Sequence, residues 1–249
     1  YILYWIRAIP AGQTRTAVLL TACSYLIMSG YDLLALRYVR HPLAMGKTVL
    51  TSFLGYTFSN NIGLAMVAGA SVRYRLYSAW GLSAMEITQV VLFCTISIWL
   101  GFCALSGAVF VAEPMALPHS LLWPVRTVRP LGMLLLALAV LYFSVTLAGR
   151  RVLTLKGWRL RLPSWRLAGA QVIIASADWL MIGTVLYVLL PQNTSLGFGH
   201  FLEIFLLAQL AGLASQVPGG LGVFETGFLL LIPADIAAPH VLGALVVYR

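Results

Sequence analysis

The chain has 249 residues, of which 61% are hydrophobic and 9% are charged, and its mean hydropathy is +0.92. These values lie far outside the range of soluble globular domains and predict an all-α polytopic membrane protein. The formal net charge is +9, but Lys and Arg gather at the ends of apolar runs, where an inside-positive bias and anionic lipid headgroups account for them. We therefore expect no nucleic acid to bind this segment.

The sequence contains no arrangement that is typical of catalysis or of metal binding. Cys23, Cys94 and Cys103 fall inside apolar runs without metal-ligand spacing, so packing is their expected role. A phosphate-binding loop, a Gly-x-Ser-x-Gly elbow and a His-Glu-x-x-His motif are absent from the sequence. We predict no catalytic residue, no metal and no cofactor for this segment.

The apolar runs follow one another closely and predict one membrane domain over residues 1–249. The expected spans are 16–36, 48–72, 87–111, 131–149, 167–190, 200–232 and a last one that starts near residue 241. Residues 150–166 hold six Lys and Arg and no acid, which places this loop in the cytoplasm. Because the chain opens on Tyr1 and stops at Arg249 within an apolar run, we expect it to be part of a longer protein.

Two of these runs are interrupted by residues that a continuous membrane helix would not contain. Residues 215–225 read Ser-Gln-Val-Pro-Gly-Gly-Leu-Gly-Val-Phe-Glu, and residues 59–63 read Ser-Asn-Asn-Ile-Gly. Proline and clustered glycine end a helix, and irregular backbone at membrane depth is tolerated where it lines a cavity. We expect broken or re-entrant helices; the alternative is a surface loop between short spans. The predicted cavity-lining residues are Ser59, Asn60, Asn61, Arg75, Ser215 and Gln216.

An aspartate precedes each break, and charge counting gives the two halves opposite orientations. Asp32 lies in the span before the first break, and Asp178 lies in the span before the second. If residues 48–72 enter and leave from the cytoplasm, the five Lys and Arg between residues 37 and 75 all lie inside, as does the 150–166 loop. Two inverted repeats with discontinuous helices are typical of transporters. Arg7 and Arg15 would then lie outside, against the bias.

Ionisable residues inside the spans are the candidate site, because an Asp or Arg at a helix centre costs about 2.5–3.5 kcal/mol on insertion scales. For Asp32, Asp178 and Glu225, two interpretations stay open: an interhelical ion pair or polar cap, and contact with a cationic group of a substrate. For Arg73 and Arg75, the alternatives are charges that snorkel at span ends and guanidinium groups that bind phosphate oxygens.

The candidate groups together favour an amphiphilic substrate. Carboxylates suit amines, arginines and glycine-rich helix ends suit phosphate, and apolar spans suit acyl chains. We therefore expect a substrate with a cationic or zwitterionic headgroup. Glu203 and Gln209 share one approximate helix face, and we expect interhelical hydrogen bonds from them rather than ligand contacts.

Four stretches carry a resemblance to a known family. They are Gly-Tyr-Asp-Leu-Leu-Ala-Leu at 30–36, Phe-Ser-Asn-Asn-Ile-Gly at 58–63, Gly-Ala-Ser-Val-Arg-Tyr-Arg-Leu-Tyr at 69–77, and residues 215–225 quoted above. In order and position, these stretches resemble the membrane domain of the bacterial multiple peptide resistance factor. A related family of shorter membrane proteins shares the Pro-Gly-Gly-x-Gly-x-x-Glu break without a synthase, which leaves the lipid substrate open.

The resemblance implies a bifunctional protein of the bacterial cytoplasmic membrane. Its multi-pass region flips lysyl- or alanyl-phosphatidylglycerol from the inner to the outer leaflet, which lowers the negative surface charge and gives resistance to cationic antimicrobial peptides. A C-terminal synthase domain makes this lipid from aminoacyl-tRNA. The implied partners are aminoacyl-phosphatidylglycerol, anionic phospholipid and the protein's own synthase domain, and the implied headgroup-binding positions are Asp32, Arg73, Asp178 and Glu225.

Two other functions stay open at this point. The segment could mainly support a phosphatidylglycerol lysyltransferase, by docking the synthase and supplying it with phosphatidylglycerol. It could also be a scaffold or a homo-oligomerisation module, because small residues such as Ala65 and Gly69 let helices approach closely.

Overall fold

Helices make up almost all of the structure, a computed structural model that describes residues 9–61, 65–115, 127–148, 152–155, 158–191, 196–215, 217–233 and 236–249. Among the described residues, four helices are long and apolar enough to cross a membrane. They are α2 (Ala11–Val39), α5 (Ala84–Ala112), α6 (Arg129–Leu147) and α7 (Trp165–Leu189). At 1.5 Å per residue, the 29 residues of α2 extend about 43 Å, which exceeds the roughly 30 Å of a hydrocarbon core. This helix therefore crosses with a tilt or reaches into the headgroup region.

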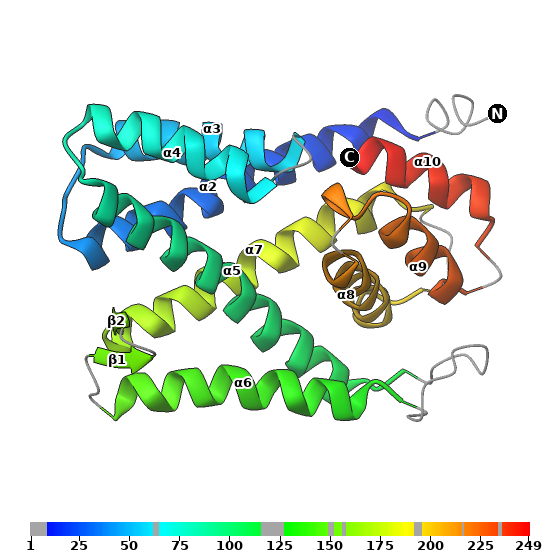
Figure 1. Cartoon of the computed structure of the whole chain (residues 1–249). Coiled ribbons are helices and arrows are strands. Elements are labelled where there is room, and N and C mark those ends of the chain that lie inside the picture. The colour runs from blue at the N-terminus through cyan, green and yellow to red at the C-terminus, as the bar shows by residue number, and fades with distance from the viewer. Residues whose placement is uncertain are drawn as a thin grey trace.

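The first interrupted run forms a helical hairpin. Helix α3 (Met45–Asn61) and helix α4 (Ala65–Ala79) pack against each other, and α3 also packs against α2. The hairpin lies beside α2 and opens toward the end where α2 finishes (Figure 1). The three residues between the two helices lie outside the described residues. For this run, the charge count predicts a pair of helices that enters and leaves the membrane from the cytoplasmic side.

The second interrupted run is broken by glycines in a left-handed conformation. Helix α8 (Phe198–Ala214) is followed by the short 3-10 turn η1 (Pro218–Gly220) and by α9 (Val223–Leu231). Gly219 and Gly220 both have φ of +63°, and Gly222 has φ of +80°. A side chain strains such backbone, so these glycines allow the chain to reverse and α9 to pack on α8. Helix α10 (Ala238–Tyr248) follows.

The two interrupted segments are arranged as inverted repeats. Helix α2 runs toward the end of the molecule that carries the strands, whereas α7 runs away from it (Figure 1). These two helices pack extensively on each other, and each is followed in sequence by a broken pair. The predicted all-α polytopic fold is confirmed, apart from one short strand pair, and the opposite directions of α2 and α7 are those that two inverted repeats require.

The basic loop contains structure that was not expected. Strand β1 (Val152–Leu155) pairs antiparallel with β2 (Trp158–Arg161), with Val152 opposite Arg161. Only two residues connect the strands, and the second strand alternates apolar and basic residues. Both features are typical of a hairpin. The basic segment that the sequence places in the cytoplasm thus contains a short two-stranded hairpin.

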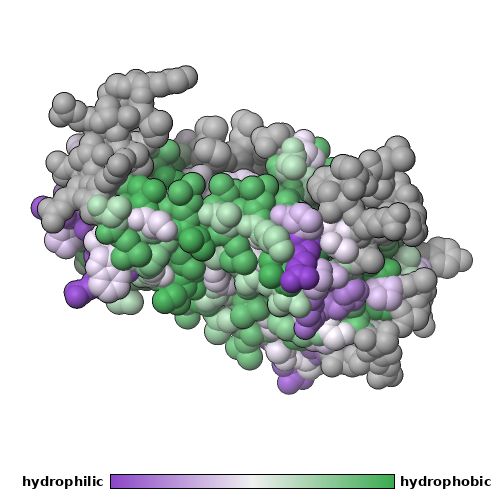
Figure 2. Space-filling view, turned by 90° about the horizontal axis from the view of Figure 1, so that it is seen from below, coloured by the Kyte–Doolittle hydropathy of each residue, from purple (hydrophilic) through white to green (hydrophobic). Residues whose placement is uncertain are grey.

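Two hydrophobic cores correspond to the two halves. One is centred on Tyr31, Tyr77 and Phe93, and the other contains Phe201 and Phe228. Outside these cores, large apolar side chains are exposed along the spans, as a lipid-facing surface requires. Figure 2 shows an apolar band across the middle of one face, with hydrophilic residues toward its ends. The molecule is a membrane protein.

Candidate functional site

Asp32 and Arg73 form a buried ion pair between α2 and α4. The Arg73 guanidinium donates from Nε to Asp32 Oδ1 and from Nη2 to Oδ2, both at 2.9 Å. The Tyr77 hydroxyl, one helical turn beyond Arg73, donates to Oδ1 at 2.8 Å. The Asp32 side chain is fully buried, and Arg73 is 5% exposed. Of the two interpretations open for Asp32, the interhelical ion pair is the one that this arrangement contains.

Asp178 has no such partner among the residues that the structure describes. Its carboxylate lies in the middle of α7 and is 3% exposed. Ser24 donates to Oδ1 at 2.9 Å and Tyr31 donates to Oδ2 at 3.0 Å, both from α2. No ion pair joins Asp178 to a cation within the described part of the chain. A buried carboxylate with only neutral donors is costly in its charged form unless it takes up a proton or meets a cation.

Aromatic rings connect the two carboxylates. Tyr31, which donates to Asp178, has its ring centroid 6.0 Å from that of Tyr56 on α3. The Arg73 guanidinium lies over the Tyr56 ring at 4.4 Å from its centroid, a cation–π contact. The Tyr56 hydroxyl is buried and finds no hydrogen-bond partner among the residues described. The result is one polar layer that crosses α7, α2, α3 and α4.

Glu225 lies apart from this layer and acts as a cap. Its Oε2 accepts the backbone N–H of Gly222 at 2.7 Å, and its Oε1 accepts Arg249 Nε at 2.6 Å. The Glu225 and Arg249 side chains are 20% and 31% exposed. The carboxylate thus holds the glycine turn and joins the start of α9 to the end of α10.

The predicted cavity-lining residues have different environments. Ser59 is half-buried against α4, so close to Gly69 that a side chain there would overlap its hydroxyl. Arg75 is exposed. Ser215 is exposed, and its hydroxyl donates to the carbonyl of Gly212 at 2.7 Å. The side chains of Asn60 and Asn61, and the whole of Gln216, lie outside the described residues.

Three hydroxyl groups of the layer were not predicted: Ser24, Tyr31 and Tyr77. Tyr31 and Tyr77 stand inside the quoted motifs, but no role was assigned to them there. A helical-face argument could have found Ser24 and Tyr31, because residues seven apart lie on one face of a helix. Their pairing with Asp178 depends on how α2 crosses α7, which sequence spacing does not give.

An apolar groove lies between α2 and α3 near this layer. Its volume is about 340 Å³, and its walls come from Tyr25, Leu26, Ser29, Gly46, Val49, Leu50 and Phe53. The lining is almost wholly apolar, so the groove suits an alkyl chain.

The fold and the buried layer define a class of protein: a helical membrane protein whose inverted repeats enclose paired and unpaired charges. The chain is 36% identical to the inner membrane protein YbhN of Escherichia coli over 94% of its own length and 73% of that protein. It is 40% identical to an uncharacterized protein of Synechocystis, over 100% of its length and 77% of the relative. The chain belongs to the family of the inner membrane protein YbhN.

A more distant similarity extends to lipid-modifying proteins. The chain is 29% identical to the phosphatidylglycerol lysyltransferase of Bacillus subtilis, over 86% of the chain and 24% of that protein. It is 26% identical to the Staphylococcus aureus phosphatidylglycerol lysyltransferase, over 91% of the chain and 26% of that protein. The resemblance to the multiple peptide resistance factor is thereby confirmed. No protein-family model matches the chain.

Proposed function

We propose that this protein moves a phospholipid with an amine-bearing headgroup, of the aminoacyl-phosphatidylglycerol class, from the inner to the outer leaflet of the bacterial cytoplasmic membrane. The observation that carries the proposal is Asp178. It is a buried carboxylate in the middle of a span, and among the described residues it has hydroxyl partners but no cation. A headgroup ammonium that passes the bilayer centre would supply the missing charge.

The geometry around Asp178 leaves acceptor positions for an ammonium. A carboxylate has about four acceptor positions, and Ser24 and Tyr31 occupy one on each oxygen. The remaining positions can accept an ammonium, which donates three hydrogen bonds. Both hydroxyl groups come from α2, so binding at Asp178 is coupled to the packing of α2 against α7.

The Asp32–Arg73 pair provides the second part of the proposed path. Arg73 is a bidentate donor whose fork also fits two phosphate oxygens. In the present arrangement Asp32 occupies that fork. A lipid phosphate would have to replace Asp32 at Arg73, and this exchange would loosen α4 from α2. The Asp32–Arg73 pair therefore keeps the proposed path closed. The groove between α2 and α3 can hold an acyl chain.

The similarity to phosphatidylglycerol lysyltransferases supports the choice of lipid. Those proteins are named for transfer of lysine to phosphatidylglycerol, and the chain matches about a quarter of their length. Transport of the product of that reaction would raise the positive charge of the outer leaflet and protect against cationic antimicrobial peptides. The same similarity supports the second candidate, a membrane part that serves the synthase, for which the basic 150–166 loop offers an inner-face contact.

Reconstitution tests the proposal directly. Liposomes that contain lysyl-phosphatidylglycerol only in the inner leaflet, with or without the protein, are exposed to a membrane-impermeant amine reagent over time. We expect the protein to speed the appearance of labelled amine, and phosphatidylglycerol alone to give no such signal. Equal rates with and without protein would contradict transport and favour the synthase-support function.

A further inference from the structure

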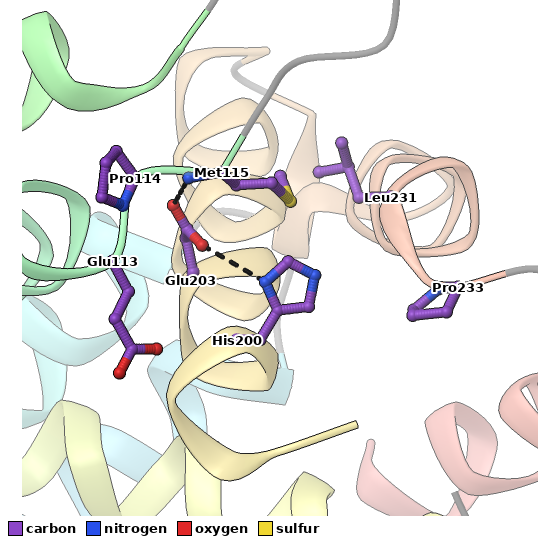
Figure 3. Close-up of a pocket in the computed structure, with 7 residues that line it drawn as sticks. All are labelled: Glu113, Pro114, Met115, His200, Glu203, Leu231 and Pro233. Atoms are coloured by element: carbon purple, nitrogen blue, oxygen red, sulfur yellow. Dashed lines mark hydrogen bonds and ion pairs between the residues drawn. The ribbon is translucent and has the colours of Figure 1, made fainter. Parts of the chain in front are cut away.

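A second carboxylate site lies at the opposite end of the molecule from the β1–β2 hairpin. A cavity of about 600 Å³ is lined by Glu113, Pro114, Met115, His200, Glu203, Leu231 and Pro233. These residues come from the end of α5, the start of α8 and the end of α9 (Figure 3). The volume is in the range of cavities that hold small ligands. Because the basic 150–166 loop is expected in the cytoplasm, the opposite end of the molecule faces the outer leaflet.

Glu203 is the group that makes this cavity a site. Its side chain is fully buried, and its Oε1 accepts the backbone N–H of Met115 at 2.6 Å. The other oxygen, Oε2, makes no hydrogen bond to any described residue. His200 Nδ1 lies 3.5 Å from Oε2, which is an ion-pair distance without hydrogen-bond geometry. One oxygen of a buried acid in the lining therefore lacks a hydrogen bond among the described residues, and the His200 imidazole lies beside it (Figure 3).

The charge around the cavity is not balanced. Glu113 is a second carboxylate in the lining, and it lies so close to Gly199 that any side chain there would collide with it. Neither Glu113 nor Glu203 forms an ion pair with a Lys or Arg in the described ranges. His200 compensates one charge only when it is protonated. The lining thus carries net negative charge and attracts a cation.

The composition of the lining favours an alkylammonium over a metal ion. No group of three or more His, Cys, Asp or Glu among the described residues can hold a metal, and Glu203 has already committed one oxygen to Met115. An ammonium needs fewer ligands and one or two compensating charges. The rest of the lining, Met115, Leu231 and the two prolines, suits the methylene groups that carry such an ammonium.

We propose that the Glu113–Glu203 cavity is an exit site, which binds the ammonium of the transported headgroup at the outer end of the path. This proposal rests on the proposed lipid transport. The exit site would give the headgroup ammonium a second carboxylate to bind after Asp178. Apolar contacts from α5 and α9 hold the alkyl part. Because its walls come from α5, α8 and α9, the occupied site also joins the second broken pair to α5.

Lipid retention by purified protein in nanodiscs tests this site. Lysyl-phosphatidylglycerol and phosphatidylglycerol are supplied together, and native mass spectrometry counts each lipid on wild type, Glu203→Gln and Glu113→Gln. Glutamine keeps an acceptor for the Met115 N–H, so we expect Glu203→Gln to fold. Its preference for the lysyl lipid should fall roughly tenfold, the effect of losing a charged hydrogen bond. The matched control is Glu86→Gln, an acid that caps α5 at its other end.

The outcomes separate this site from transport itself. An unchanged lysyl-lipid preference in Glu203→Gln overturns the exit site, as does displacement of the lipid by millimolar Mg²⁺, which would show a site for inorganic cations. If Glu203→Gln fails to fold, Glu113→Gln gives the same test with the same interpretation. Absence of protein-dependent amine exposure in liposomes would contradict the proposed function instead, whatever the nanodisc result.

Discussion

Breaking the ion pair between α2 and α4 gives the most quantitative prediction. In Arg73→Gln, the buried Asp32 carboxylate loses two charged hydrogen bonds of 2.9 Å and keeps only the one from Tyr77. Charged hydrogen bonds contribute about 1.5–3 kcal/mol each, and loss of one partner of a buried pair costs about 3–5 kcal/mol. We expect Arg73→Gln to lower the free energy of unfolding by about 3–5 kcal/mol.

The reverse change is expected to be similar in size. Asp32→Asn keeps an amide oxygen that can accept one of the two Arg73 bonds, but it leaves the buried guanidinium without a compensating charge, so its cost should also be about 3–5 kcal/mol. The double variant leaves neither charge unpaired. It should therefore be more stable than Arg73→Gln alone, and the two changes should be strongly non-additive.

Unfolding in mixed detergent micelles, followed by tryptophan fluorescence, measures the four free energies of this cycle. Wild type, both single variants and the double variant are compared under one condition. If the double variant loses the sum of the two single effects to within about 0.5 kcal/mol, the side chains act independently. That result would refute the ion pair as the contact that holds α4 on α2.

Two further changes test the packing of α5 on α7 and the cap of the second break. A side chain at Gly101 would overlap Ala175 on α7, so Gly101→Val should lower the midpoint of thermal unfolding by several degrees. Gly12→Ala, which has open space around it, should leave the midpoint unchanged. Equal midpoints for the two variants would contradict this packing. Glu225→Gln removes a partly exposed ion pair with Arg249 and should lower the free energy of unfolding by at most about 1 kcal/mol. A larger loss in the detergent unfolding assay would mean that this cap is essential for the fold.

The sequence was sufficient for the order of elements because membrane helices are set by local composition. Apolar runs predicted the spans, and the Pro-Gly-Gly-Leu-Gly stretch predicted the break that Gly219, Gly220 and Gly222 produce with positive φ. The orientation of the halves followed from where Lys and Arg stand. Each of these signals lies within a single segment of the sequence, so it can be recognised without knowing which other segments pack against that segment.

The partners of the candidate residues could not be predicted in the same way. Asp32 and Arg73 are 41 positions apart, and only the return of α4 along α2 brings them together. The contact of Asp178 with Ser24 and Tyr31 depends likewise on the crossing of α7 over α2. For Glu203, sequence reasoning favoured an interhelical hydrogen bond, whereas its bond goes to the backbone of Met115, beyond the end of α5. That its second oxygen is buried without a hydrogen bond among the described residues could not be read from the sequence.

The most direct test of the account is the effect of Asp178→Asn on lipid exposure. The substitution keeps the shape and removes only the charge of the carboxylate that lacks a cation among the described residues. In liposomes loaded with lysyl-phosphatidylglycerol on the inner leaflet, amine labelling should be at least roughly tenfold slower with Asp178→Asn than with wild type. The Glu86→Gln control should match wild type. Equal rates for wild type and Asp178→Asn, both faster than protein-free liposomes, would contradict a carboxylate in the path of the headgroup.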